Sequence, residues 1–210
     1  MIRNPVVAGQ FYPGEAAPLR SMIKKMVDET APRTDVVGIV VPHAGYIYSG
    51  RVAGAVYSRI IFPDTFIIMG PNHTGNGLPL SIMTEGTWKT PLGDVEIDSE
   101  LAKKILSSSE YLEEDFLAQQ NEHSIEVQVP FLQYFRKDVK IVPIVLGFAD
   151  TSSYQAIGKE IARTVKELNK KVVIVASSDM THYETQDAAR KKDTQAIQAI
   201  LELNEIWTSR

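Results

Sequence analysis

The sequence predicts an α/β fold, with a mainly parallel mixed sheet that is covered by helices. Four apolar runs predict its strands, at residues 36–41, 65–69, 141–146 and 172–176. Near-continuous β-branched runs of this kind are typical of strands that are buried on both faces of a sheet. Helical patterns lie between and after these runs, and this alternation favours a parallel sheet.

The other elements follow from periodicity and from turn residues. Apolar residues at helical spacing predict helices at 15–29, 52–60, 99–106, 154–168 and 185–203, and Asp98 or Ser99 would cap the third. Residues 124–135 are amphipathic, with an interruption at Pro130. Pro143 weakens the run 141–146 as a central strand and predicts an edge position or a bulge. The runs 80–83 and 95–97 flank a turn-rich stretch and predict an antiparallel pair.

Length and composition exclude several classes of protein. With 210 residues, 44% hydrophobic and 23% charged, the chain is expected to form a single α/β domain over residues 1–210. A net charge of −4 argues against a nucleic-acid partner, and no run is long enough to span a membrane. Together with an N-terminus that opens no secretory signal, this predicts a cytoplasmic protein.

Cysteine is absent, so that disulfides, thiolate metal sites and cysteine nucleophiles are excluded. A metal site in this chain must therefore use histidine, carboxylates and carbonyl oxygens. No glycine-rich nucleotide motif and no nucleophile-elbow motif is present, which leaves Ser49, Ser177 and Ser178 as weak candidates for a nucleophile.

Three of the four histidines follow predicted strands. His43, His73 and His182 come two, four and six residues after the first, second and fourth apolar runs. Because ligands of open α/β sheets bind beyond the carboxyl ends of the strands, the set predicts a metal or acid/base site built from three loops. The alternative is that each histidine merely caps a strand or packs in a loop; we favour it for any single histidine, but not for the set.

Two further residues are candidates for the same site. Asp179 lies three residues before His182, where it could orient the imidazole or bind a metal, although an Asx turn or a helix cap explains an aspartate there equally well. His123 and Glu126 would share one face of a helix. A surface helix with a solvated ion pair is the alternative for that pair.

Five motifs together resemble the MEMO family, over the whole chain and in the family's order. They are PVVAGQFYP at 5–13, PHAGYIYSG at 42–50, GPNH at 70–73, EHSIEVQVP at 122–130 and SSDMTHY at 177–183. The resemblance implies the fold of the class III extradiol ring-cleaving dioxygenases, which are non-haem Fe(II) enzymes. It also implies two possible partners, an AMMECR-type protein and a radical-SAM enzyme, whose genes often neighbour those of the family in prokaryotes.

The resemblance also assigns roles to residues. His43 and His73 match the two metal-binding histidines of the family. His182, with Asp179 beside it, matches a pocket pair that serves as acid/base in the dioxygenases, and we also count His182 as the third candidate metal ligand. His123 matches a histidine that lines the pocket and is kept as a catalytic candidate. The implied metal is Fe(II), with copper and zinc as alternatives.

One departure from the family concerns the C-terminus. Members of the family usually continue for some tens of residues beyond the last motif, and that segment supplies a cysteine where the dioxygenases have a glutamate ligand. We therefore expect the natural gene to encode a longer protein, and the chain of 210 residues to lack this segment and its ligand.

Three functions are compatible with these residues. We favour a metal-dependent oxidoreductase of the dioxygenase type, with a substrate that the sequence does not identify. The alternatives are a binding or adaptor module that holds a peptide or small ligand, and a metal-assisted hydrolase. Arg51 is the only arginine close in sequence to these loops, which argues against a phosphate-reading adaptor. The oligomeric state is left open, with a homo-oligomer as one alternative.

Overall fold

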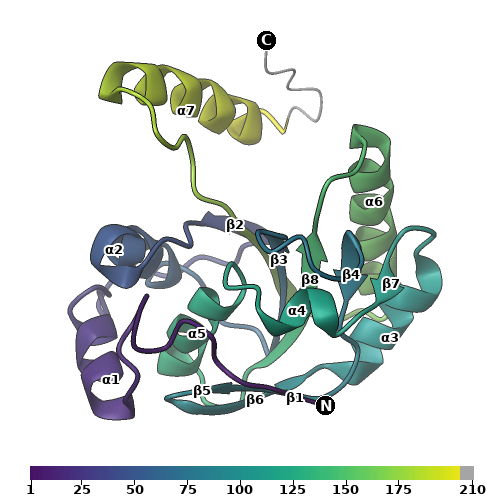
Figure 1. The fold of residues 1–210 in the computed structure, drawn as a ribbon, viewed down its shortest axis with the longest axis horizontal. Coiled ribbons are helices and arrows are strands. Elements are labelled where there is room, and N and C mark those ends of the chain that lie inside the picture. The colour runs from purple at the N-terminus through teal and green to yellow at the C-terminus, as the bar shows by residue number, and fades with distance from the viewer. Residues whose placement is uncertain (204–210) are drawn as a thin grey trace. The chain divides into compact units, whose positions relative to one another are not determined.

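The structure is a computed structural model that describes residues 1–203, and it confirms the α/β fold. The chain divides into two compact units, the first spanning Met1–Ser178 and the second beginning at Asp179. The first unit contains the sheet (Figure 1). In the second unit, helix α7 spans Gln186–Leu201 and is capped by the side chain of Thr185. The expected single domain over residues 1–210 remains a prediction.

The sheet has nine strands within residues 1–203, seven of them in the order β1-β5-β6-β8-β3-β9-β2. Along this path the strands are β1 Ile2–Arg3, β5 Thr87–Thr90, β6 Gly93–Ile97, β8 Lys140–Leu146, β3 Thr65–Pro71, β9 Val172–Ser177 and β2 Gly38–Val41. Strands β4 (Leu80–Ile82) and β7 (Glu113–Glu114) lie off this path, and β4 pairs with β8. Four strands, β8, β3, β9 and β2, are neighbours in parallel register, which confirms the four apolar runs as strands of a mainly parallel sheet.

Helices lie on either side of this sheet (Figure 1). One group consists of α1 Ala16–Lys24, α2 Tyr46–Tyr57 and α5 Val129–Phe135, and the other contains α3 Ser99–Ser108 and α6 Thr151–Glu167. Helix α4 (Leu117–Gln120) packs on β4 and β8. The predicted cap of α3 is confirmed, because the Asp98 side chain accepts a hydrogen bond from the backbone N–H of Leu101. No helix among residues 1–203 has the length and apolar character needed to cross a bilayer.

The antiparallel pair predicted from residues 80–83 and 95–97 is wrong. Strand β6 instead folds back on β5, with the turn completed at Gly93, whose φ of 122° favours glycine. Strand β4 pairs antiparallel with the end of β8. The run at 95–97 thus pairs with the segment just before it in the chain, and the run at 80–83 pairs with β8, far along the chain.

The edge position predicted from Pro143 is also wrong, because β8 lies between β3 on one side and β6 and β4 on the other. On that second side, β6 pairs with Lys140 and Ile141, and β4 pairs with residues 144–146. The carbonyl of Pro143 points to this side, where it accepts from the N–H of Met83. The proline therefore lies at the change from one partner to the other, where its missing N–H interrupts no ladder.

Residues 124–135 form a short 3-10 turn, η1 (Glu126–Gln128), followed by α5. Pro130 lies in the first turn of α5, where a proline needs no N–H, so it begins a helix rather than interrupting one. The alternative of a surface helix with a solvated ion pair is wrong, because Glu126 is completely buried.

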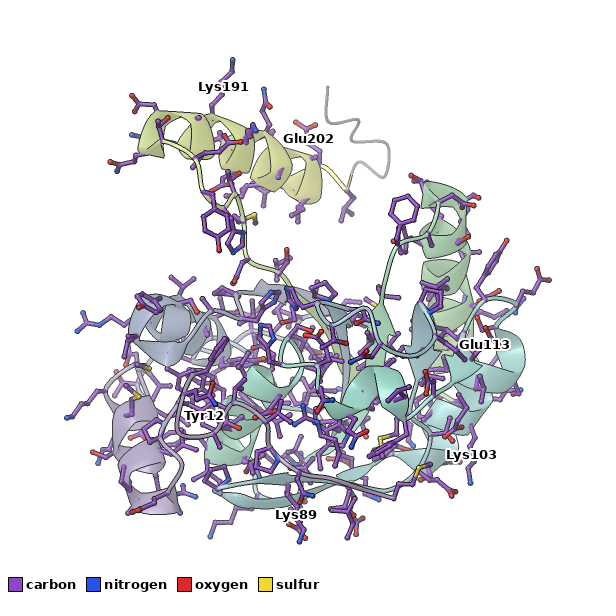
Figure 2. The ribbon with its side chains drawn as sticks, viewed as in Figure 1. Tyr12, Lys89, Lys103, Glu113, Lys191 and Glu202 are labelled. Carbon is purple, nitrogen blue, oxygen red and sulfur yellow. The ribbon has the colours of Figure 1, made fainter. Side chains whose placement is uncertain are left out.

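Glu126 is buried against Arg3, which is also completely buried. Its carboxylate pairs with the Arg3 guanidinium and accepts from the backbone N–H groups of Val6 and Val7 and from the hydroxyl of Tyr12 at 2.6 Å. Tyr12 lies in the interior of the first unit (Figure 2). Burial, followed by the neighbouring Glu126 charge, raises the pKa of Tyr12 well above its ordinary value, so this phenol remains a donor.

Arg3 holds the other end of the same segment. Its guanidinium donates to the carbonyl of Glu122 at 2.6 Å and to that of Gln119 at 3.3 Å, and its centre lies 4.4 Å from the ring centroid of Trp88. The pair therefore fixes residues 119–126 against the N-terminal strand. Buried charges are tolerated when they are paired and hydrogen-bonded in this way.

Replacing Arg3 with methionine should lower the free energy of unfolding by about 3–5 kcal/mol, because Glu126 would keep its buried charge without its partner. Urea denaturation would measure this loss. Lys103→Met is the control, since Lys103 pairs with Glu85 at the surface and its replacement should leave the denaturation midpoint unchanged (Figure 2). A midpoint for the Arg3 variant that equals that of the control would contradict the assigned role.

Candidate metal centre

Two histidines lie at the same edge of the sheet, just after the ends of two strands. Strands β2 and β3 are both parallel to β9, which lies between them, so their carboxyl ends point in one direction. His43 follows the end of β2, and His73 follows the end of β3. His123 joins them from the loop between α4 and η1, whose position depends on Arg3.

The structure brings these three imidazoles together. The ring centroids of His43 and His73 are 5.1 Å apart, with ring planes at 78°. His123 lies 4.5 Å from His73 and 5.9 Å from His43, and the edge of Phe11 packs on it at 4.9 Å. His43 is buried, whereas 41% of the His73 side chain and 22% of the His123 side chain are exposed. The cluster is therefore accessible to solvent on the side of His73.

Glu122 orients His73, and we did not single it out from the sequence. Its carboxylate accepts from the backbone N–H of His73 at 2.6 Å and contacts the ring Nδ1 at 2.9 Å. Burial acts to raise the pKa of Glu122, but hydrogen bonds from His73 and from the N–H of Ser124 outweigh burial and hold this pKa below its ordinary value. An ionised carboxylate only accepts, so Nδ1 of His73 carries a proton, and in the neutral imidazole the lone pair is then on Nε2.

The donor atoms of His73, Glu122 and His123 lie within 4.8 Å of one another, so this group could hold a metal ion. The two rings, however, are stacked, with an angle of 21° between their planes. A metal lies in the plane of each imidazole that binds it, and nearly parallel planes do not meet close by. One ring would therefore have to turn before both could bind a single ion.

His43 and His73 have the more favourable orientation. Two imidazoles that share one ion at about 2.1 Å, with a bond angle of about 90–110°, have centroids roughly 4.5–5.5 Å apart. The observed separation of 5.1 Å lies in this range, and steeply inclined ring planes, unlike stacked ones, can meet at a shared ion. The donor set contains nitrogen and carboxylate oxygen and no sulfur, which suits a transition metal better than magnesium or calcium.

His182 and Asp179 belong to the second unit. Nε2 of His182 lies 3.5 Å from a carboxylate oxygen of Asp179, and 56% of the His182 side chain is exposed. The backbone N–H of Thr181, between them, donates to Asp193 of α7 at 3.0 Å. Their participation in a site with His43, His73 and His123 stays a prediction.

The turn beside the histidines is held by three buried tyrosines, one for each residue of η1. Tyr12 donates to Glu126, Tyr46 donates to the carbonyl of Val127 at 2.7 Å, and Tyr57 donates to the side chain of Gln128 at 3.0 Å. Burial raises the pKa of Tyr46 and of Tyr57 above the ordinary value, so both phenols remain donors. These contacts fix the turn that adjoins the loop carrying Glu122 and His123.

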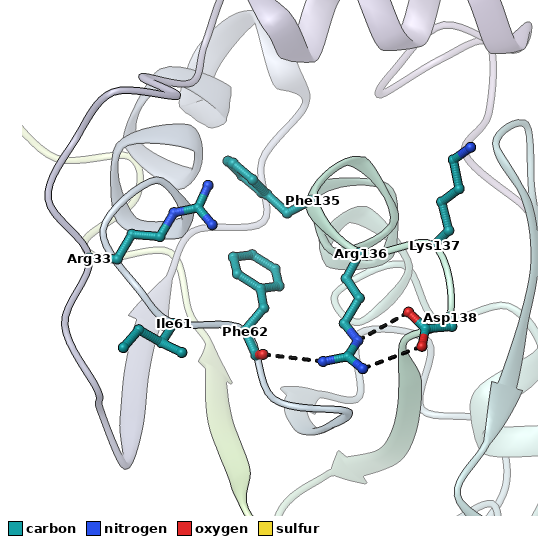
Figure 3. A pocket seen from close by; sticks show the side chains of 7 residues that line it. All are labelled: Arg33, Ile61, Phe62, Phe135, Arg136, Lys137 and Asp138. Carbon is teal, nitrogen blue, oxygen red and sulfur yellow. Dashed lines mark hydrogen bonds and ion pairs between the residues drawn. The ribbon is translucent and has the colours of Figure 1, made fainter.

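A separate cavity of about 520 Å³ lies at the opposite edge of the sheet, before the amino ends of β3 and β8 (Figure 3). It is lined by Arg33, Ile61, Phe62, Phe135, Arg136, Lys137 and Asp138. Arg136 pairs with Asp138 and Asp64, and the Arg33 guanidinium lies 5.2 Å from the Phe135 ring centroid. None of these residues belongs to the histidine cluster.

Glu122→Gln should lower the free energy of unfolding by about 1–3 kcal/mol at neutral pH, because buried hydrogen bonds to a charged group are lost. Since the pKa of Glu122 is lowered from 4.5, its contribution is complete above that pH and is lost as the pH falls below it. The difference from the wild type should therefore shrink as the pH is lowered below about 4.5, as measured by urea denaturation. A constant difference over that range would contradict this assignment.

The sequence matches the family model described as "Memo-like protein" over residues 3–208. It is 47% identical to the MEMO1 family protein of Methanococcoides burtonii, over 97% of this chain and 76% of the relative. It is also 46% identical to MEMO1 family protein PAE0818 of Pyrobaculum aerophilum, over 97% of this chain and 77% of the relative. A third relative, the MEMO1 family protein of Archaeoglobus fulgidus, is 46% identical with the same coverage of this chain. The chain therefore belongs to the Memo-like, or MEMO, protein family.

Proposed function

We propose that this protein binds one transition-metal ion through His43 and His73 and is an iron-dependent redox enzyme. The observation that carries the proposal is the pair of imidazoles, 5.1 Å apart and steeply inclined, at the carboxyl edge of a parallel sheet. Glu122 supports it, because a carboxylate behind a ligating histidine is a recurrent feature of protein metal sites.

Fe(II) is the metal that we propose, with copper or zinc as alternatives. Two histidines with further positions open to other ligands suit Fe(II) and oxygen chemistry, and bound iron would supply the redox step. His182 is a candidate either for a third ligand or for the acid/base, and we take it as the acid/base. His123 stacks on His73 and so helps to fix the ring, and its position beside the proposed ligands also lets it contact a substrate.

His182 would then act as a general base, with Asp179 beside it. A phenolic or enolic substrate must lose its hydroxyl proton as it binds a metal, and a neutral imidazole is a suitable acceptor. Asp179, 3.5 Å from Nε2 of His182, would stabilise the protonated ring. A small substrate with adjacent hydroxyl groups, such as a catechol, fits this assignment.

Calorimetric titration of the metal-free protein with Fe(II), under anaerobic conditions, tests the metal site. We expect one equivalent to bind, and His43→Ala and His73→Ala each to weaken binding by more than the 10–100-fold typical for loss of an orienting partner. Ser58→Ala is the control, because Ser58 is buried away from the histidines and should have no effect. Unchanged binding in the His43 variant would show that the ion lies elsewhere.

Oxygen consumption by the Fe(II)-loaded protein, measured with a panel of catechols, tests the redox assignment. We expect uptake with at least one catechol, and His182→Ala should lower its rate by about 100-fold or more while leaving Fe(II) bound, as expected for loss of a general base. Tight Fe(II) binding with no uptake on any catechol would contradict the dioxygenase-type assignment. It would instead favour an adaptor or a hydrolase.

A further inference from the structure

A chain of buried polar groups lies behind His43. Nδ1 of His43 is 3.1 Å from the hydroxyl oxygen of Ser177, at the end of β9, and both residues are at least 96% buried. Ser177 in turn contacts the side chain of Gln128, from η1, and the carbonyl of Ser124. Because these groups are shielded from water, their hydrogen bonds must be satisfied within the protein.

The orientation of the Gln128 amide follows from its neighbours. Its nitrogen lies 3.0 Å from the carbonyl oxygen of Pro42, which can only accept, so the NH2 group must point there. Its oxygen accepts from the hydroxyl of Tyr57 at 3.0 Å. The NH2 group therefore also faces Ser177, to which it donates at 2.8 Å.

The Ser177 hydroxyl can then hydrogen-bond to His43 in only one way. A hydroxyl carries one proton and two lone pairs. The hydroxyl donates a hydrogen bond to the carbonyl oxygen of Ser124, 2.6 Å away, and one of its lone pairs accepts a hydrogen bond from the Gln128 N–H. Only an acceptor site remains for His43, so Nδ1 of His43 must be the donor.

We propose that Ser177, held by Gln128 and Ser124, is a positioning residue that fixes His43 in the tautomer with its proton on Nδ1 and its lone pair on Nε2. The proton assignment stands on the hydrogen bonds alone, while its consequence for a metal rests on the proposed function. His73 has the same tautomer, imposed by Glu122. The two proposed ligands thus present the same nitrogen to the metal, although one is supported by a neutral hydroxyl and the other by a carboxylate.

This difference makes the two ligands unequal. A carboxylate partner raises the basicity of a ligating imidazole, and a hydroxyl does so less. His73 is therefore the more basic of the two proposed metal ligands, and His43, which is buried, is the less basic one. Ser177, a weak candidate for a nucleophile from the sequence, has instead a hydroxyl whose proton is committed to a backbone carbonyl.

The tautomer can be observed directly in the metal-free protein. Nitrogen NMR of the full chain labelled with 15N-histidine, at a pH of about 8.5 where free imidazole is neutral, distinguishes a protonated Nδ1 from a protonated Nε2. His43→Gln assigns the signal. We expect His43 to be protonated on Nδ1, and a proton on Nε2 would overturn the proposal whatever the metal does.

Ser177→Ala tests whether this hydroxyl sets the tautomer. His43 should then populate the form with the proton on Nε2, and affinity for Zn²⁺ alone should fall by about 10–100-fold. Ser58→Ala is the matched control, because Ser58 is equally buried, donates to the carbonyl of Gly54 and accepts from the N–H of Asp28. It should leave the His43 signal unchanged and the zinc affinity within about 3-fold.

The outcomes separate this inference from the proposed function. An unchanged His43 tautomer in a folded Ser177→Ala protein would refute the role of Ser177. If that variant does not fold, the wild-type spectrum still decides whether Nδ1 is protonated. A wild type with the expected tautomer that binds neither Zn²⁺ nor Fe(II) would leave the inference standing and refute the metal site.

Discussion

The buried ion pair between Arg3 and Glu126 is the contact on which the geometry of the candidate site depends. It joins the first strand to a segment more than a hundred residues away, and both charges are completely removed from water. Such a pair is costly unless every remaining polar atom is satisfied. Here two backbone N–H groups, a phenol and two backbone carbonyls complete the network.

This ion pair helps to position the two histidines through two short series of contacts. Arg3 holds the carbonyl of Glu122, whose carboxylate orients His73. Glu126 begins the turn η1, whose last residue, Gln128, supports Ser177 and through it His43. One buried network thus positions the surroundings of both proposed ligands, which is how a protein holds a metal site in place before the metal arrives.

The sequence predicts much of the fold because its strongest signals are local. Continuous apolar runs identify β2, β3, β8 and β9, and parallel strands bring the residues that follow them to one edge. This reasoning predicts that His43 and His73 lie together, as their ring centroids do. The edge position predicted from Pro143 is wrong because a proline in a single strand does not reveal that the strand changes partner along its length.

The rest of the site depends on contacts between distant residues. Glu122, Ser177 and Gln128 act through side chains that meet only in the folded chain, and nothing in their spacing predicts the hydrogen bonds that they make. A solvated surface position for Glu126 was one of two alternatives, and it is wrong because a buried 3-10 turn forms where the spacing predicts a helix. A charged residue within an apolar motif, as in EHSIEVQVP, was the available signal for a buried network.

The central claim is that His43 and His73 share one metal ion. Anomalous diffraction from crystals loaded with iron or zinc tests it most directly, because it locates the ion without reference to activity. We expect a single peak at about 2.0–2.2 Å from Nε2 of both histidines, with Nδ1 of His73 still bonded to Glu122. A peak bound by Glu122 and His123, with His43 outside its coordination sphere, would contradict it.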